Sequence, residues 1–326
     1  MRRTMLALLL AVVSTPISAA DWLLVGNKGE DTLSFVDLRT GQELSRLPTG
    51  RMPHEIAISP DGRQAAVVAY GGRSIDVFDI KRRAKLRTID LAQNEAPHGL
   101  IWLRNGRLLA TAERSRTLVL VEPRAADAVF AIATDQAGTH MVAVSPDLRR
   151  AYTANIPAGT VTIVDLEKRR KLKDLAVSGR PEGIAVSPDG KTLWVADLEG
   201  ARVQIFSTRA IEMGRPTPLA VVPTGKRPIR VAFSPDGRFA VTSNFLDGTL
   251  TVIDAATRKP VWTIAVSGQE AAAQVTILFS SDGKRIYAAE TGRNQVAEID
   301  FASGRVLRRL PAGAQGDGLA LAKTAD

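Results

Sequence analysis

The sequence predicts an all-β fold, namely a seven-bladed β-propeller built from four-stranded blades. Three observations support this prediction: a repeated strand–turn–strand phrase, a repeat spacing of 42 to 47 residues, and two chain ends that supply complementary parts of one repeat. Four short strands in each repeat of about 40 to 50 residues are typical of a propeller blade. We therefore expect one propeller domain over residues 21–326, preceded by a cleaved segment at residues 1–20.

The repeated phrase consists of an apolar run, a turn of the Pro-Asp-Gly type and a second apolar run. Clear copies read HEIAISPDGRQAAVVAY, HMVAVSPDLRRAYTAN, EGIAVSPDGKTLWVAD, IRVAFSPDGRFAVTSN and VTILFSSDGKRIYAAE, and a degenerate copy reads HGLIWLRNGRLLATAE. Proline presets the backbone of a turn and glycine accepts a positive φ, so each copy predicts a β-hairpin. Alternating segments such as TVTIVDLEKRR and KLKDLAVSG follow the hairpins and predict a third and a fourth strand. No segment shows a convincing helical period.

The residues that open the seven units define the ring. They are His54, His98, His140, Glu182, Ile229, Val275 and Asp317. The N-terminal segment DWLLVGNKGEDTLSFVDLRTGQELSRLPTG supplies three strands without a first strand, and the C-terminal DGLALAKTAD supplies a lone first strand. Pairing of these two segments completes the seventh blade and closes the ring, which leaves no long sheet edge exposed.

The N-terminus reads as a secretory signal. Arg2 and Arg3 form a basic start, residues 5–13 an apolar stretch, and residues 18–20 a small-residue cleavage site. This apolar stretch is shorter than the roughly 20 residues that a membrane-spanning helix needs. We therefore expect an exported chain, periplasmic or secreted, with no membrane span, and we expect it to be a monomer.

The composition excludes several kinds of chemistry. The chain contains no cysteine, so its fold must be stable without disulfides. It also contains no Gly-x-Ser-x-Gly motif, and both absences disfavour covalent acyl transfer. The formal net charge is +9, and the basic runs KRRAK and EKRRK fall at turns between third and fourth strands. Because aromatic residues make up only 5% of the chain and no aromatic platform accompanies these runs, we expect no nucleic-acid partner.

Segments such as PEGIAVSPDGKTLWVADLEGARVQIF and GTVTIVDLEKRRKLKDLAVSGRP resemble the YVTN-type repeat family of exported seven-bladed propellers. The resemblance covers essentially the whole chain after the signal, and it implies the fold and export. It says less about function, since the family includes lactonase-like enzymes, propellers associated with quinone-dependent dehydrogenases, and proteins of unknown role. The WD40 type is a poor match because the Gly-His and Trp-Asp dipeptides are absent.

All three histidines of the chain occupy the same place in the repeat. His54, His98 and His140 each open the first strand of one of three consecutive units. First strands line the central channel of a propeller, so we expect these three side chains to meet at the channel mouth. Glu182 and Asp317 open the two flanking units, whereas the remaining two units open with apolar residues. One arc of the ring is therefore predicted to be polar.

Three imidazoles at one spot are a typical ligand set for zinc, copper, iron or nickel. Three protein ligands leave a coordination position open to water or substrate, which is more typical of catalytic than of structural metal sites. We therefore predict His54, His98 and His140 as ligands of a divalent transition-metal ion of unknown identity. Glu182 and Asp317 are predicted as acid–base groups, with a fourth ligand or a partner of a ligand as alternatives. Without a metal, the same five residues are a candidate acid–base or anion-binding cluster.

A second set of positions ends the second strand of each unit. They are Asn27, Ala69, Glu113, Asn155, Asp197, Asn244 and Glu290. In the YVTN-type pattern this position is usually asparagine and serves the turn backbone. Glu113 and Asp197 depart from asparagine in the units of His98 and Glu182, and we add Glu113 to the predicted catalytic residues and keep Asp197 as a weaker candidate. Tyr70 and Arg230 adjoin the ring and could contact a ligand, although packing or surface placement is the simpler interpretation.

Three functions remain open from the sequence. The first is a metal-dependent exported enzyme that catalyses hydrolysis of a lactone-like substrate, elimination or isomerisation, or an oxidation if the metal is copper or iron. The second is a non-catalytic module that binds a metal, a small molecule or a partner protein across the top face of the propeller. The third, which the separated basic runs disfavour, is binding of nucleic acid or the cell envelope through the basic rim.

Overall fold

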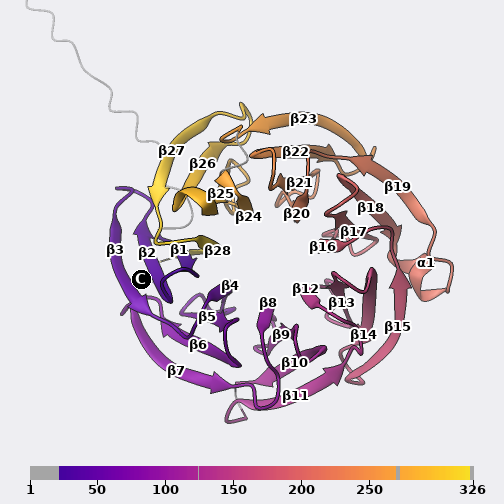
Figure 1. Cartoon of the computed structure of the whole chain (residues 1–326), viewed down its shortest axis with the longest axis horizontal. Coiled ribbons are helices and arrows are strands. Elements are labelled where there is room, and N and C mark those ends of the chain that lie inside the picture. The colour runs from indigo at the N-terminus through magenta and orange to yellow at the C-terminus, as the bar shows by residue number, and fades with distance from the viewer. Residues whose placement is uncertain (1–21, 124, 269–271, 324–326) are drawn as a thin grey trace, which may run out of the picture.

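The computed structural model describes residues 22–123, 125–268 and 272–323, in which seven four-stranded sheets surround a central channel (Figure 1). The strand pairings of these sheets are antiparallel throughout the described residues, as in the pairing of β1 with β2. The ring closes where β28 pairs with β1, with Trp22 opposite Ala322. The predicted seven-bladed propeller and its mode of closure are therefore confirmed. The predicted signal segment lies outside the described residues.

We number the blades I to VII around the ring and give their strands from the channel to the rim. Blade I consists of β28 (Gly316–Ala322), β1 (Trp22–Asn27), β2 (Thr32–Asp37) and β3 (Glu43–Pro48). Blade II consists of β4 (Pro53–Ile58), β5 (Gln64–Ala69), β6 (Ser74–Asp79) and β7 (Ala84–Asp90). Blade III consists of β8 (Pro97–Trp102), β9 (Leu108–Ala112), β10 (Thr117–Glu122) and β11 (Ala128–Ala133). Blade IV consists of β12 (Thr139–Val144), β13 (Arg150–Asn155), β14 (Thr160–Asp165) and β15 (Arg170–Ala176).

The remaining three blades have the same order. Blade V consists of β16 (Pro181–Val186), β17 (Thr192–Asp197), β18 (Arg202–Ser207) and β19 (Pro218–Pro223). Blade VI consists of β20 (Pro228–Phe233), β21 (Phe239–Asn244), β22 (Thr249–Asp254) and β23 (Lys259–Ala265). Blade VII consists of β24 (Gln274–Phe279), β25 (Arg285–Glu290), β26 (Gln295–Asp300) and β27 (Val306–Pro311).

Among the described residues, short helical segments interrupt the strands as α1 (Thr208–Glu212) between β18 and β19 and as the 3₁₀ turn η2 (Thr291–Arg293) between β25 and β26. The sequence shows no helical period because α1 has only five residues. Ser207 caps it, since its hydroxyl accepts a hydrogen bond from the backbone N–H of Ala210 at 3.2 Å. No helix in the described part of the chain is long and apolar enough to cross a membrane.

The repeated Ser-Pro-Asp-Gly phrase stabilises the turn between the first and second strands. In blade II the hydroxyl of Ser59 donates to a carboxylate oxygen of Asp61 at 2.6 Å, and the same hydroxyl accepts from the backbone N–H of Gln64 at 2.9 Å. The carboxylate of Asp61 also accepts from the backbone N–H of Arg63. The same serine–aspartate bond recurs in blades IV, V, VI and VII. This recurring network is the physical reason for the phrase that the sequence repeats.

The first strands of neighbouring blades approach closely around the channel. Glycine follows the opening residue in three blades, as Gly99, Gly183 and Gly318. A Cβ atom at Gly99 would lie 2.9 Å from the carbonyl oxygen of His140, and one at Gly318 would overlap that of His54. Only glycine allows this approach of one backbone to the next. The core itself lies between adjacent sheets, which pack buried valine, leucine, isoleucine and alanine side chains against each other.

Candidate functional site

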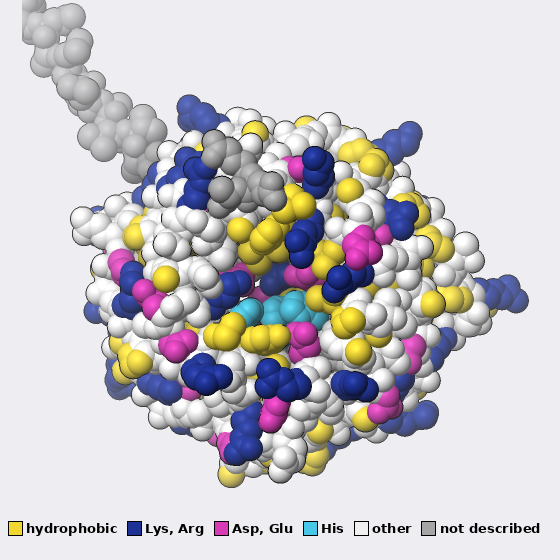
Figure 2. All heavy atoms as spheres, viewed as in Figure 1, with side chains coloured by type: hydrophobic (Ala, Val, Ile, Leu, Met, Phe, Trp, Pro, Cys, Tyr) yellow, Lys and Arg dark blue, Asp and Glu magenta, His cyan; other side chains and the backbone are white. Residues whose placement is uncertain are grey.

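The three histidines lie together at the mouth of the central channel, on the face that Figure 2 displays. They come from the starts of β4, β8 and β12 in three consecutive blades. The ring centroids of His54 and His98 are 4.7 Å apart, and those of His98 and His140 are 3.6 Å apart with an angle of 30° between the ring planes. His98 and His140 are therefore in direct ring contact, stacked at a tilt. The structure thus brings the three predicted ligands into contact with one another.

Two of the three rings are held through their Nδ1 atoms. Nδ1 of His54 lies 2.9 Å from the backbone carbonyl of Met52, and because a carbonyl only accepts, this nitrogen carries the proton and Nε2 keeps its lone pair. Nδ1 of His140 donates to Oε2 of Glu113 at 2.8 Å. Nδ1 of His98 is buried and, within the described residues, has no hydrogen-bond partner. Such backbone and carboxylate acceptors determine the orientation of a histidine ring.

The protonation states of the stacked rings differ. Burial alone would lower the pKa of His140, but the carboxylates of Glu113 and Glu182 raise that pKa to about 9. Burial, together with the positive charge of His140, lowers the pKa of His98 well below its usual 6.5. Burial also lowers the pKa of His54. At neutral pH, a neutral His98 therefore stacks on a protonated His140.

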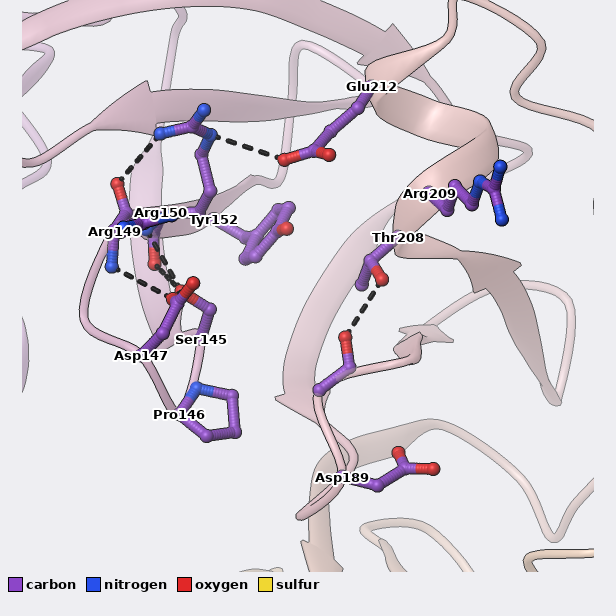
Figure 3. Close-up of a pocket in the computed structure, with 11 residues that line it drawn as sticks. Ser145, Pro146, Asp147, Arg149, Arg150, Tyr152, Asp189, Thr208, Arg209 and Glu212 are labelled. Atoms are coloured by element: carbon purple, nitrogen blue, oxygen red, sulfur yellow. Dashed lines mark hydrogen bonds and ion pairs between the residues drawn. The ribbon is translucent and has the colours of Figure 1, made fainter.

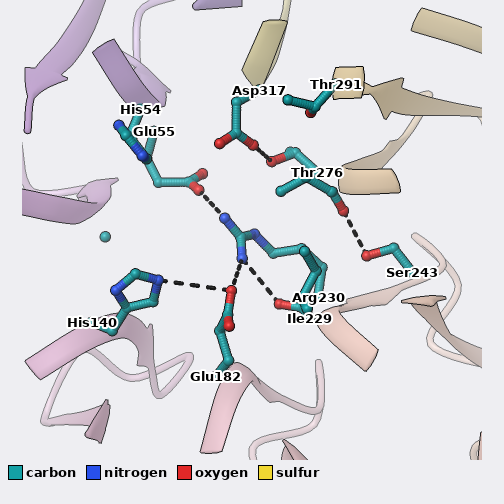
Figure 4. Close-up of polar contacts among 12 residues, drawn as sticks. His54, Glu55, His140, Glu182, Ile229, Arg230, Ser243, Thr276, Thr291 and Asp317 are labelled. Carbon is teal, nitrogen blue, oxygen red and sulfur yellow. Dashed lines mark hydrogen bonds and ion pairs between the residues drawn. The ribbon is translucent and has the colours of Figure 1, made fainter. Parts of the chain in front are cut away.

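Arg230 links the carboxylates around the channel (Figure 4). Its Nη2 lies 2.7 Å from Oε1 of Glu55, and its Nη1 lies 3.2 Å from Oε1 of Glu182. The same oxygen of Glu182 lies 3.8 Å from Nε2 of His140. Because Glu55 belongs to blade II and Arg230 to blade VI, this ion pair joins blades that are not neighbours. Arg230 is only 7% exposed, so it acts as a buried cation that holds two carboxylates together.

Asp317 lies in the same polar ring but has other partners. Its Oδ2 forms an ion pair with Nζ of Lys28 at 2.7 Å, and its Oδ1 accepts a hydrogen bond from Thr276 at 3.2 Å. Burial would raise the pKa of Asp317, yet the charges of Lys28 and Arg230 outweigh burial and lower it. Asp317 is therefore an ionised carboxylate at neutral pH.

Tyr70 contacts the histidine cluster directly. Its hydroxyl donates to Oε2 of Glu113 at 3.2 Å, the oxygen that also accepts from His140. Its ring centroid lies 4.7 Å from that of His54 and 5.7 Å from that of His98. Burial and the nearby charge of Glu113 raise the pKa of Tyr70, so the hydroxyl is a neutral donor. From the sequence, surface placement of Tyr70 was the simpler interpretation and contact with the site the alternative. The structure places Tyr70 in contact with the site.

Glu55 belongs to the cluster although the sequence pattern did not predict it, whereas Asp197, a weaker candidate, has a structural role. Glu55 follows an opening histidine, and strict strand alternation would place these two residues on opposite sides. The pairing of β4 with β5 shifts register between Pro53 and Ile56, so alternation does not hold there. Asp197 instead stabilises a turn, since its carboxylate accepts from the backbone N–H of Arg180 and pairs with Arg202.

The cluster carries more negative than positive charge. Its carboxylates are those of Glu55, Glu113, Glu182 and Asp317, and its cations are Lys28, Arg230 and protonated His140. One negative charge is therefore uncompensated, which favours a cationic ligand. In the described residues, no group of three or more histidine and carboxylate side chains is already arranged to hold a metal ion.

A separate cavity of about 430 Å³ lies between the turns of blades IV and V and α1 (Figure 3). Arg150 and Glu212 form an ion pair across it at 3.4 Å, and Thr208 donates a hydrogen bond to the carbonyl of Gly190. None of the predicted site residues lines this cavity. It therefore does not contribute to the candidate site.

Comparisons with known proteins support the fold and leave the function open. Residues 182–322 match a family model described as PQQ_2, Outer membrane protein assembly factor BamB. Antigen Lp49 of Leptospira interrogans is 24% identical over 196 residues, which cover 55% of this chain and 43% of Lp49. Hydrazine synthase subunit beta of Kuenenia stuttgartiensis is 26% identical over 227 residues, which cover 63% of this chain and 54% of that subunit. The chain thus matches about half the length of these two relatives.

Solved structures show the same architecture. The hydrazine synthase of Kuenenia stuttgartiensis superposes with a TM-score of 0.76 at 19% identity and covers 90% of this chain and 98% of that chain. The dihydro-heme d1 dehydrogenase NirN in complex with DHE superposes with a TM-score of 0.69 at 14% identity, over 96% of this chain and 77% of NirN. The YVTN-type resemblance remains a prediction. The chain is a seven-bladed β-propeller whose residues 182–322 are similar to the BamB-type PQQ_2 repeat family.

Proposed function

We propose that this chain is an exported β-propeller that binds a divalent transition-metal ion at its channel mouth through His54, His98 and His140. The observation that carries the proposal is the contact of three imidazoles from consecutive blades, two of which already donate Nδ1 to a fixed acceptor. Metal-binding histidines almost always have such a partner on the other ring nitrogen. Zinc, copper, iron and nickel all bind imidazole nitrogen, so the three histidines are suitable ligands for each of these four metals.

The charges around the histidines suit this ligand. The polar ring carries one uncompensated negative charge, and a second appears when His140 gives up its proton to bind an ion. Glu113 orients His140, while Glu182 stands beside Nε2 of His140 and is placed to act as a further ligand or as an acid–base group. Asp317, held by Lys28, adds negative charge on the other side of the ring.

We further propose that the chain is an enzyme, namely a hydrolase, lyase or isomerase that uses this metal ion in catalysis. A bound ion would polarise a substrate oxygen or activate water. The chain's own residues would bind the substrate at the mouth face, with Glu182 and Glu113 as acid–base groups and Tyr70 as a hydrogen-bond donor. Export is supported by the signal pattern of residues 1–20 and by the name of the matched family, which refers to the outer membrane.

A second candidate function is metal-free binding of a small molecule or a partner protein at the mouth face. Neutral His98 stacks on protonated His140, and both nitrogens of His140 face carboxylates. These contacts favour the alternative, because they stabilise the cluster without a bound ion. Metal binding requires His140 to lose its proton and the rings of His98 and His140 to separate. Metal-free binding requires neither change.

Calorimetric titration of metal-stripped protein with Zn²⁺, Ni²⁺ and Cu²⁺, one at a time, separates the two functions. We expect about one ion per chain for at least one of these metals, and binding at least about 100-fold weaker in His98→Ala, because a lost ligand costs no less than a lost partner of a ligand. The matched control is Glu95→Ala, which removes an exposed carboxylate of the same face and should leave the affinity unchanged. Equal affinity in His98→Ala, or no binding by the wild type, would contradict the metal site and leave the metal-free alternative.

A further inference from the structure

The positive charge of the chain is concentrated on the face opposite the channel mouth, which we call the far face. It consists of the turns that join first to second and third to fourth strands, with α1 and Lys323. Counting the residues of these turns and of the strand ends that border them, the far face holds seventeen exposed lysines and arginines and seven exposed aspartates and glutamates within the described residues. The loops of the mouth face, counted in the same way, hold eight exposed lysines and arginines and five exposed aspartates and glutamates. Exposed positive side chains thus outnumber exposed negative ones by about ten on the far face and by three on the mouth face.

Part of this charge is arranged as a ring. A basic residue occupies the same position after the turn in six blades: Arg63, Arg107, Arg149, Lys191, Arg238 and Lys284. Because the blades are related by rotation about the channel, equivalent positions surround the channel on one face. Five of the six are exposed and only Arg107 is partly covered. The basic runs of the rim were predicted to be separate hairpin tips, whereas these six residues belong to an inner set of turns.

Five of the seven exposed acidic residues of the far face are aspartates that accept a serine hydroxyl within the turns between first and second strands. Asp61, for example, accepts hydrogen bonds from Ser59 and from the backbone N–H of Arg63. Ser59 and that backbone N–H lower the pKa of Asp61, which shows that its negative charge is stabilised locally. Within the described residues, the side chains of Arg63, Arg149 and Lys284 form no ion pair. These long cationic side chains are therefore free to bind an external anion.

We propose that the far face binds the anionic headgroup surface of a phospholipid bilayer. The exposed cations are distributed around the channel on the turns of one face, and this arrangement fits a planar array of anions. Each lysine or arginine near such a surface strengthens binding about fivefold. Nucleic acid fits less well, since Phe130 is the only exposed aromatic residue among those described and Arg169 covers its ring. Binding in this orientation leaves the histidine cluster on the face directed away from the membrane, and it does not depend on whether that cluster holds a metal.

Co-sedimentation with vesicles tests this proposal on the full exported chain. We expect binding to vesicles that contain phosphatidylglycerol, weakening as salt is raised, and no binding to vesicles of phosphatidylcholine alone. The triple variant Arg63→Glu, Arg149→Glu, Lys284→Glu should bind at least about 100-fold more weakly. The corresponding glutamine variant, which only removes the charges, should fall between this variant and the wild type.

The matched control reverses three exposed cations of the mouth face, Arg114→Glu, Arg180→Glu and Lys226→Glu, and so changes the net charge by the same amount. We expect this control to weaken vesicle binding less than about tenfold. Equal weakening by the two triple variants would show that net charge alone matters, and it would overturn the proposal. Failure of the wild type to distinguish the two kinds of vesicle, or tighter binding to single-stranded DNA than to either, would also overturn it.

Discussion

We expect Arg230→Ala to lower the free energy of unfolding by about 3–5 kcal/mol at neutral pH. Arg230 is buried and holds both Glu55 and Glu182, so its removal leaves two carboxylates in the channel without their shared cation. Removal of one partner from a buried ion pair costs far more than the pair contributes, because the remaining charge has lost its water as well as its partner. Urea denaturation of the wild type and the variant measures the difference.

The pH dependence of this loss distinguishes its cause. In the wild type, the charges of His140 and Arg230 outweigh burial and lower the pKa of Glu182. Without Arg230, the pKa of Glu182 should rise although His140 still lowers it, so the loss of stability is largest above this pKa and shrinks as the pH falls through it. Addition of Glu55→Gln to the variant should recover part of the stability. Arg114→Ala, which breaks an exposed pair with Glu95, should cost less than about 1 kcal/mol. A similar loss in both single variants would contradict a role of Arg230 as a buried cation.

Gly318→Ala is the second change for which we expect a large effect, about 3 kcal/mol or more of lost stability. An added Cβ would overlap the backbone carbonyl of His54, which cannot move without moving β4. The same displacement would push β4 toward blade III and disturb the contact between the His54 and His98 rings. Thermal unfolding measures the loss of stability, and the intensity of the histidine signals in an NMR spectrum reports on the cluster.

Gly72→Ala provides the control for this prediction. A Cβ at Gly72 would meet only the carbonyl oxygen of Ala69, at an ordinary contact distance of 3.8 Å. Its stability should change by less than about 1 kcal/mol. If Gly318→Ala were tolerated equally well, the close approach of β28 and β4 would not be required for the ring to close.

The repeat predicts the fold because each local pattern agrees with the next. The hairpin phrase, the spacing of its copies and the incomplete first and last units all indicate seven blades, and the pairing of Trp22 with Ala322 confirms the closing strand. The insertion of α1 was not predictable from hydrophobic periodicity, since five residues are too few to show a helical period.

The site was predictable only where identical positions carry identical chemistry. Equivalent positions in consecutive blades must lie side by side, so the meeting of His54, His98 and His140 follows from the repeat alone. The role of Glu55 depends on an irregular strand register, and its bond to Arg230 crosses the channel, so neither follows from spacing. The stacking of the rings likewise depends on how closely two backbones approach, which a sequence pattern does not specify.

Glycine is the one sequence signal that points toward this stacking. Gly99 follows His98, and a Cβ at this position would lie 2.9 Å from the carbonyl oxygen of His140. A glycine beside an opening residue therefore indicates close approach of the next blade.

The most direct test of the central claim, that three blades present their imidazoles to a single ligand, is ¹⁵N NMR of the histidine ring nitrogens in metal-stripped protein during addition of Zn²⁺. We predict that signals of all three rings change together and stop changing at one ion per chain. Rings that respond at different stoichiometries, or that keep their chemical shifts throughout, would contradict a shared site.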